Sequence, residues 1–186
     1  MKEEVEKAIK VLQSGGVLIY PTDTVWGIGC DATNEQAVTR VFDIKQRSES
    51  KSLIILVDGI DMLQNYIPFI PEVIYGILNE SKRPTTVVYD HPKGLAPNVV
   101  AQDDTVAIRI VKHQFCEDLI HHFGKPIVST SANISNLKTP GSFSEIDHSL
   151  LNRVDYIVNL PQKESQNRAS QIIKVNDLGE IEYIRK

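Results

Sequence analysis

Apolar residues along this chain follow two spacings, one typical of helices and one typical of buried strands. Val5, Ala8 and Leu12 recur at helical spacing, and a glycine pair at 15–16 ends this predicted helix. Short, almost uninterrupted apolar runs follow, as expected of strands that are covered on both faces. The pattern predicts strands at 17–20, 53–57, 85–89, 106–110, 126–129, 156–158, 171–175 and 180–184, and helices at 5–12, 37–44, 71–78, 114–123 and 145–151.

Helices interleaved with short buried strands indicate an α/β protein in which helices cover both faces of a sheet, giving three layers. The close strand pair at 171–175 and 180–184 favours a mixed rather than a wholly parallel sheet. Thr33-Asn-Glu-Gln36 has the form of a capping box, which predicts that Thr33 caps the second helix. The length of 186 residues fits one domain over 1–186.

Composition and charge narrow the class of protein. The chain is 41% hydrophobic and 24% charged, and its apolar runs are too short to cross a bilayer. The charged N-terminal segment lacks the apolar core of a signal peptide, so we expect a cytoplasmic protein without a membrane partner. Two cysteines without CxxC, HExxH or clustered histidines predict no disulfide framework and no protein-held metal. A net charge of −4 disfavours indiscriminate nucleic-acid binding but permits a local basic cleft.

A polar cluster, Pro21-Thr-Asp-Thr24, directly follows the first predicted strand. Proline cannot donate to a sheet ladder, so the strand is expected to end there, where α/β proteins collect ligands. On residue types alone, an ordinary turn in which Asp23 and the threonines bond their own backbone is the alternative. The next segment, 27–32, has the form GxGxxA but does not begin at a strand end. We interpret its glycines and Trp26 as packing and turning the chain beneath the polar cluster.

A second cluster is cationic and contains Lys45, Arg47 and Lys51. Residues two apart do not share a helix face, so the first two converge on one ligand only if the helix has ended. A fixed guanidinium fork and mobile ammonium groups suit a polyphosphate or a carboxylate. The alternative is a solvated helix C-terminus, where cations complement the helix dipole.

Two further polar groups lie behind or within apolar strands. Ser129-Thr-Ser-Ala-Asn133 offers small donors and acceptors, which suit a nucleotide or an amino acid held against backbone, although a plain polar turn would look the same. Thr105 and Arg109 lie four positions apart and therefore on one face of a strand. A buried arginine needs a partner, and either a ligand carboxylate or an internal Asp or Glu would serve.

Taken in order, four segments resemble the YrdC-like family of threonylcarbamoyl-AMP synthases: GGVLIYPTDTVWGIGCDA, KQR…K-LIILV, TVAIRI and PIVSTSANIS. The resemblance runs from about Gly15 to Ile173, and ASQII near its end is similar to the family's last serine-bearing strand. Each motif alone is weak, but four at suitable spacing are highly specific. The resemblance implies a three-layer YrdC-like fold with a twisted, mixed β-sheet flanked by helices, in the single-domain form.

The resemblance also implies a reaction and partners. Threonine takes up CO2 or bicarbonate to form a carbamate, which attacks the α-phosphorus of ATP, with Mg²⁺ carried on the phosphates. The product is L-threonylcarbamoyladenylate, which a partner complex transfers to tRNA. The family's catalytic KxR and SxN motifs map onto Lys45, Arg47, Ser131 and Asn133. Threonine-binding positions map onto Thr24, Arg109 and Ser129, and ATP-binding positions onto Arg47, Lys51, Thr105, Ser131, Thr139 and Ser170.

This sequence departs from the family pattern at several positions. A segment similar to WPGPLT reads SKRPTT at 81–86, prolines are replaced by Ser48 and Ser52, and Trp26 stands where tyrosine is commoner. These changes affect the expected loop conformations rather than the cationic pair. Two other functions stay open: an RNA-binding module that uses a basic surface, and a hydrolase of the same adenylate. The first would use the cations Lys45, Arg47, Lys51, Lys82 and Arg83, although no aromatic residues are interleaved with them.

Overall fold

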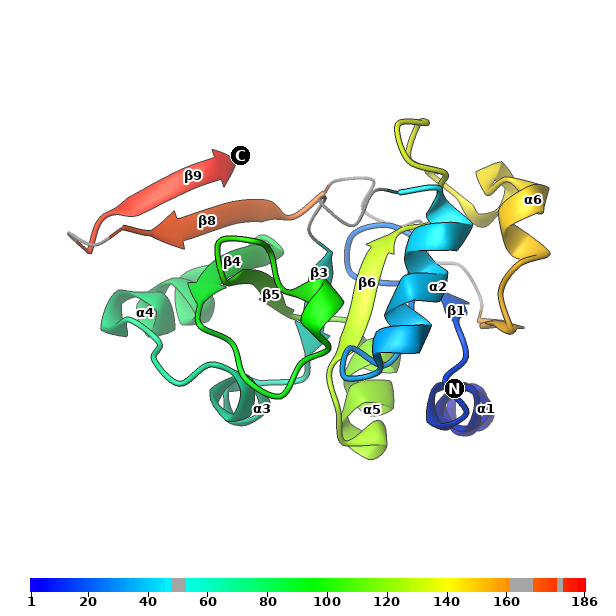
Figure 1. The fold of residues 1–186 in the computed structure, drawn as a ribbon, viewed down its shortest axis with the longest axis horizontal. Coiled ribbons are helices and arrows are strands. Elements are labelled where there is room, and N and C mark those ends of the chain that lie inside the picture. The colour runs from blue at the N-terminus through cyan, green and yellow to red at the C-terminus, as the bar shows by residue number, and fades with distance from the viewer. Residues whose placement is uncertain (48–52, 161–168, 177–178) are drawn as a thin grey trace.

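The computed structural model describes residues 1–47, 53–160, 169–176 and 179–186, and within them nine strands form one sheet (Figure 1). Its strand order is β7-β1-β2-β6-β3-β5-β4-β8-β9. Three neighbouring pairs, β1–β7, β3–β5 and β4–β8, are parallel and the others are antiparallel, which confirms the mixed sheet. The strands are β1 (Leu18–Tyr20), β2 (Gly27–Gly29), β3 (Ile54–Val57), β4 (Thr85–Asp90), β5 (Thr105–Ile110), β6 (Ile127–Ser131), β7 (Tyr156–Ile157), β8 (Gln171–Val175) and β9 (Ile181–Arg185).

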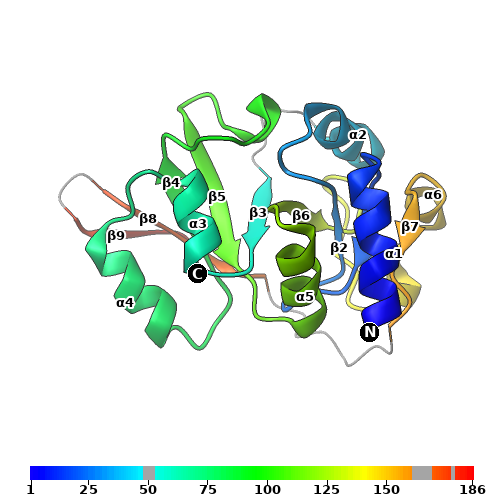
Figure 2. The ribbon, with the colours of Figure 1, turned by 90° about the horizontal axis from the view of Figure 1, so that it is seen from below.

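Helices pack on both faces of the sheet, which confirms the three layers. On one face, α1 and α5 lie side by side (Figure 2) and bury Leu56 and Ile127 of the central strands. Apolar side chains of α2, α3 and α4 join the core on the other face, together with Ile55 and Val128. The helices are α1 (Lys2–Gln13), α2 (Glu35–Lys45), α3 (Ile60–Tyr66), α4 (Glu72–Glu80), α5 (Gln114–Phe123) and α6 (His148–Leu151), with 3-10 turns η1 (Pro97–Val99) and η2 (Phe143–Glu145).

The start of α2 differs from the predicted capping box by one residue. Asn34 is the N-cap, and its side-chain oxygen accepts a hydrogen bond from the Ala37 N–H at 3.1 Å. The Thr33 hydroxyl instead donates to the buried Asp31 carboxylate at 2.6 Å. The Thr33 hydroxyl therefore binds the Asp31 carboxylate, a stronger acceptor outside the helix, and does not take part in a capping box.

The predicted turn at the glycines is wrong, because Gly27–Gly29 forms strand β2 between β1 and β6. A β-carbon on Gly29 would lie 1.7 Å from the Val128 carbonyl oxygen, far inside contact distance. Glycine is required here because the backbones of β2 and β6 approach too closely for any side chain. The close approach, and not a dinucleotide, explains the GxG pattern.

Three further boundaries differ from the sequence predictions. Helix α3 was not predicted, because only Leu63 of its seven residues is buried and so short a stripe gives little periodic signal. The predicted helix at 145–151 is divided into η2 and α6. Strand β6 continues to Ser131, because pairing with Gly27 extends it past the predicted end. No helix in the described part of the chain is long and apolar enough to cross a membrane.

Candidate active site

The predicted threonine-binding residues Arg109 and Ser129 lie on one face of the central strands. Leu56 of β3 pairs with Arg109 of β5, and Ile54, two residues earlier on the same face, pairs with Ser129 of β6. Paired residues project to the same side of a sheet, so these two polar side chains occupy adjacent rows. Helices α1 and α5 cover the rest of this face. The polar groups come from β5 and β6, which are separated by β3.

Thr105 and Ser131, both predicted to contact ATP, lie at the other end of the same face. Thr105 begins β5 and Ser131 ends β6, and both extend past the row of Ile54 in the same direction. Four residues of strand separate Thr105 from Arg109, about 13 Å. The sheet therefore places Arg109 at one end of this surface, and Thr105 and Ser131 at the other. The prediction that Thr105 and Arg109 share a face of one strand is confirmed.

Arg109 is buried and forms an ion pair with Asp23 of the segment that follows β1. Its Nη2 donates to Asp23 Oδ1 at 3.0 Å and lies 3.4 Å from Thr24 Oγ1, and both charged side chains are almost fully buried. The internal carboxylate that the sequence left open is therefore Asp23. The Arg109 Nε–H is buried without a hydrogen-bond partner. One strong donor of this guanidinium is thus available to a ligand carboxylate.

Hydroxyl groups gather beside this arginine around Gly27. Thr22 and Thr24 hydroxyl oxygens lie 3.0 Å apart, and Thr22 also donates to the Val25 carbonyl at 2.7 Å. A β-carbon on Gly27 would lie 3.2 Å from Ser129 Oγ and 3.3 Å from Thr22 Cγ2. The turn that the sequence left as an alternative occurs at Thr22, while Thr24 contacts Arg109 and Ser129 lies beside Gly27. All three residues predicted to bind threonine are brought together.

Neighbouring elements hold the 21–24 segment in place. The thiol of Cys116 in α5 donates to the Pro21 carbonyl at 3.2 Å, and burial raises the pKa of this thiol well above its ordinary value. Asp23 Oδ2 also accepts the Lys112 backbone N–H at 3.3 Å. The hydroxyl of the fully buried Tyr20 donates to the Val128 carbonyl at 2.9 Å. These contacts fix the polar segment from three sides.

The cationic cluster lies at the Ser131 end. Helix α2 ends at Lys45, and Gln46 takes a left-handed conformation with φ of 50°, so the chain turns before Arg47. Lys45 is only 1% exposed, and its ammonium donates to the backbone carbonyls of Ser131 and, at 2.7 Å, Asn133. Arg47 is half-buried and its charge contributes to the lowered pKa of Lys45, which places the two cations near one another. Lys51 lies outside the described residues.

Lys45 gives a pH-dependent contribution to stability. Burial first, and then the charge of Arg47, lowers its pKa from 10.5 to about 7. Between these values the unfolded chain binds a proton that the folded chain does not, so stability rises with pH by up to about 1.4 kcal/mol per unit. We expect the free energy of unfolding of the parent protein, measured relative to Lys45→Met, to increase from pH 7 towards pH 10. A pH-independent difference in urea titrations would contradict this.

Asn133 has one side-chain oxygen that the fold leaves unused. Its Nδ2 donates to the carbonyls of Ile134 at 2.9 Å and Leu137 at 2.8 Å, whereas its Oδ1 is buried without a hydrogen-bond partner. A buried acceptor without a donor is costly, so the arrangement fits a ligand that brings a donor or a cation. Thr139, also predicted to contact ATP, is exposed in the segment that follows.

Ser170 and an arginine that the sequence analysis missed lie next to Arg109. Thr86 pairs with Arg109 across β4 and β5, and its hydroxyl lies 2.8 Å from Ser170 Oγ. Arg185 of β9 donates to the Ser170 carbonyl at 2.9 Å and to its hydroxyl at 3.2 Å. Burial, together with the charge of Arg109, lowers the pKa of Arg185. Only the β8–β9 hairpin brings this distant residue to the site, so the sequence carried no local signal for it.

The segment at 81–86, which departs from the family pattern, bends at 82–83 and enters β4 at Thr85, beside the site. Ser81 Oγ donates to the Arg83 carbonyl at 2.9 Å, and Lys112 Nζ donates to the Ser81 carbonyl at 3.3 Å. Lys82 is exposed, but Arg83 is half-buried. With Lys45 buried as well, the described cations do not form the open basic surface that an RNA-binding module would use.

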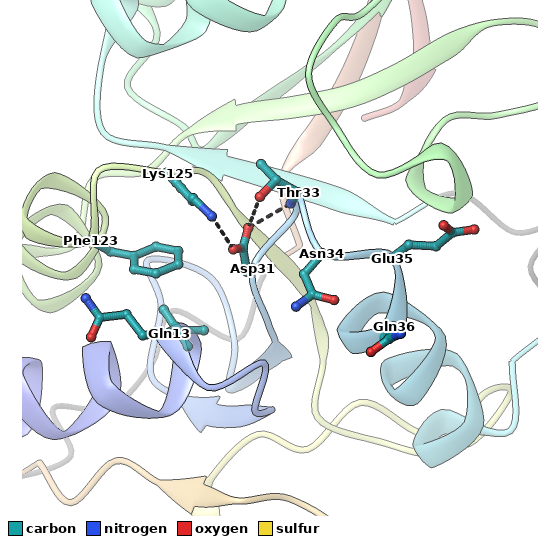
Figure 3. Close-up of a pocket in the computed structure, with 9 residues that line it drawn as sticks. Gln13, Asp31, Thr33, Asn34, Glu35, Gln36, Phe123 and Lys125 are labelled. Atoms are coloured by element: carbon teal, nitrogen blue, oxygen red, sulfur yellow. Dashed lines mark hydrogen bonds and ion pairs between the residues drawn. The ribbon is translucent and has the colours of Figure 1, made fainter.

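A polar pocket of about 580 Å³ lies at the opposite end of β6 from Ser131 (Figure 3). Its central carboxylate, Asp31, accepts hydrogen bonds from the backbone and hydroxyl of Thr33 and from Lys125 Nζ at 2.9 Å. Asp31 thereby joins the start of α2 to the segment that leads from α5 into β6. This pocket contains none of the predicted site residues.

Comparison with known proteins identifies the family. The sequence model Sua5_yciO_yrdC, described as Telomere recombination, matches residues 10–186. The threonylcarbamoyl-AMP synthase of Pseudoalteromonas translucida (strain TAC 125) is 36% identical over 160 residues, covering 84% of this chain and 86% of that protein. The protein of the same name from Hahella chejuensis (strain KCTC 2396) is 41% identical over 130 residues, covering 69% of this chain and 71% of that protein.

Solved structures share the fold. P. abyssi Sua5 complexed with L-threonine matches with a TM-score of 0.81 at 26% identity, covering 91% of this chain and 50% of that one, so this chain spans half its length. E. coli YciO matches with a TM-score of 0.87 at 21% identity, covering 100% of this chain and 90% of that one. The sheet face with its two polar ends thus belongs to a YrdC-like α/β fold.

The chain belongs to the Sua5/YciO/YrdC family. Curated relatives over most of its length are named as synthases, which favours an enzyme of the transferase type over a non-catalytic RNA-binding module.

Proposed function

We propose that this protein is a threonylcarbamoyl-AMP synthase, which makes L-threonylcarbamoyladenylate and pyrophosphate from L-threonine, bicarbonate or CO2, and ATP. The observation that carries the proposal is the arrangement of two polar ends on one sheet face. Arg109, with a buried unpaired donor, lies among hydroxyl groups at one end. Ser131 and Asn133, held by Lys45, lie at the other end.

Each end suits one substrate. At the first, Arg109 Nε binds the threonine carboxylate, and the hydroxyls of Thr24 and Ser129 bind its polar groups. At the second, Arg47, Thr105, Ser131 and Thr139 contact ATP, and we propose that Lys51 and Ser170 contact ATP as well. Ser170 lies beside Thr86, close to Arg109. A contact between Ser170 and ATP would therefore place ATP next to the bound threonine.

The chemistry is a displacement at phosphorus. The carbamate oxygen of N-carboxythreonine bonds to the α-phosphorus of ATP, and the bond to the β-phosphate oxygen breaks, so pyrophosphate leaves with that electron pair. The carbamate is already an anion, so no general base is required. Fixed donors stabilise the charge that develops on the phosphoryl oxygens and the leaving group. Arg47 is the cation in the described residues that we assign to this role.

Mg²⁺ is proposed to enter with the phosphates of ATP, since it commonly takes few protein ligands. The unused Oδ1 of Asn133 is an oxygen donor that fits such a cation. The magnesium would neutralise phosphate charge. The enzyme is thus a nucleotidyltransferase, and we place it in the cytoplasm, where a threonylcarbamoyl-transferring complex would pass its product to tRNA.

Product formation tests this proposal. The protein, incubated with ATP, Mg²⁺, L-threonine and bicarbonate, is expected to release pyrophosphate and to form the adenylate, as detected by mass spectrometry. Arg47→Ala should lower the rate by about 100-fold or more, because fixed charge at the phosphoryl group contributes several kcal/mol.

The same experiment separates the other functions. Omission of threonine should abolish the adenylate, and D-threonine serves as a matched control for the shape of the amino-acid end. Absence of both products, with tight RNA binding at moderate salt, would favour the RNA-binding module instead. Consumption of added threonylcarbamoyladenylate by water, without its synthesis, would favour the hydrolase.

A further inference from the structure

The ammonium of Lys45 is buried and faces protein carbonyls. It ends α2, is 1% exposed, and donates to the backbone carbonyls of Ser131 and Asn133. An ammonium has three donors, so two of them are committed to this one segment. Because Lys45 is buried and paired in this way, its ammonium is not positioned to bind a phosphate group during the reaction.

The segment that Lys45 holds leaves the sheet after Ala132, which is buried and donates to the Trp26 carbonyl at 2.9 Å, so Asn133 is the first residue beyond these sheet contacts. Its turn is tight, because the Asn133 N–H also donates to the Ser131 carbonyl at 2.8 Å. The Lys45 carbonyl in turn accepts the Ser135 N–H at 2.9 Å, so the helix end binds the segment through both side chain and backbone. Residues 134–139 are partly or fully exposed and supply little apolar packing. The position of Asn133 therefore depends on the end of α2 as well as on the contacts of its own amide with the Ile134 and Leu137 carbonyls.

We infer that Lys45 is a positioning residue, which fixes the 131–133 segment through its carbonyls so that Ser131 and Asn133 face the reacting phosphate, without itself touching the nucleotide. This inference rests on the proposed function, to which it adds the role of one residue in the reaction. The inference also links the KxR and SxN motifs, which are far apart in sequence, because the lysine of the first motif binds the backbone of the second.

Lys45→Met tests the inference, since methionine retains an apolar stem but has no donor. Hydrogen exchange is measured on the substrate-free protein at the amides of Ala132, Asn133, Ser135 and Leu137, all of which donate to backbone carbonyls. We expect their exchange to accelerate by about tenfold or more as the segment opens locally. With substrates, kcat should fall by about 100-fold because the reacting groups are misplaced, while KM for ATP changes by less than about threefold.

Arg153→Met is the matched control. Arg153 Nη1 donates to the Ile44 carbonyl at 3.1 Å, at the same helix end but not to the 131–133 segment. This variant should keep the parent exchange rates at those amides and the parent kcat. If it changed both as strongly as Lys45→Met does, the effect would belong to the helix end in general, and the inference would be overturned.

Lys45→Arg provides a second route should the methionine variant fail to fold. Arginine keeps the charge and the donors but has a larger head group, so it should protect the amides yet shift the segment and lower kcat. Parent kcat in this variant would show that a cation alone suffices. Unchanged exchange in Lys45→Met together with a raised KM for ATP would show direct nucleotide binding. Either result overturns the inference, and the exchange measurement holds even if the parent protein makes no adenylate.

Discussion

Replacing Arg109 with methionine is expected to raise KM for threonine by about 10- to 100-fold, because a charged hydrogen bond contributes about 1.5–3 kcal/mol. Stability should fall as well, by about 3–5 kcal/mol, since one partner of a buried ion pair is left alone. The remaining partner is Asp23, whose carboxylate is almost fully buried. Threonine titrations of initial rates and urea denaturation measure the two effects separately.

Asp23→Asn in the Arg109→Met background separates the two roles of the arginine. Asparagine removes the uncompensated charge, so the double variant should recover a large part of the lost stability. It should not recover threonine binding, because the donor to the substrate carboxylate is still absent. Recovery of both quantities would show that Arg109 serves the fold alone and does not bind the substrate.

The second large effect is expected at Gly29. Alanine there would place its β-carbon 1.7 Å from the Val128 carbonyl oxygen, so β2 and β6 must separate. We expect a loss of about 4 kcal/mol or more, in the range that few single substitutions reach. Thermal or urea unfolding measures it, and a loss below about 1 kcal/mol would contradict the close approach of the two strands.

Two other glycines serve as controls for this substitution. Gly76→Ala lies in the middle of α4 with nothing within 4 Å of its β-carbon, so it should stabilise the protein by about 0.5–1 kcal/mol. Gly27→Ala places a methyl group between Thr22 and Ser129 at 3.2–3.3 Å. This variant should fold and bind threonine more weakly, which distinguishes a glycine of the site from a glycine of the sheet.

Much of the fold could be predicted because its signals are local. The helical spacing that begins at Val5 and apolar runs such as 53–57 reflect burial within one element. The corresponding elements, α1 and β3, occur close to the predicted ranges. Some errors arose where a neighbour distant in sequence decided the outcome, and others where a competing local acceptor or a short helix altered the local signal. Gly29 looked like part of a turn, yet the Val128 carbonyl of β6 requires it within a strand. Thr33 looked like a cap, yet Asp31 takes its hydroxyl.

The candidate site shows the same division. The clusters at 21–24, 45–47 and 129–133 could be found from residue types and from the resemblance to a family. Their mutual placement could not, because the sequence does not state which strands are paired. Arg185 illustrates this, since only the β8–β9 hairpin brings it to Ser170.

The sequence by itself determined the layered α/β class, the polar clusters at 21–24, 45–47 and 129–133, and the family to which the chain belongs. These follow from periodicity and from ordered local motifs. Tertiary structure alone decided that Asp23 neutralises Arg109, and that Lys45 binds the carbonyls of Ser131 and Asn133. The reason is physical: the partner of a buried charge is set by packing between elements far apart in the chain, and local patterns do not record it.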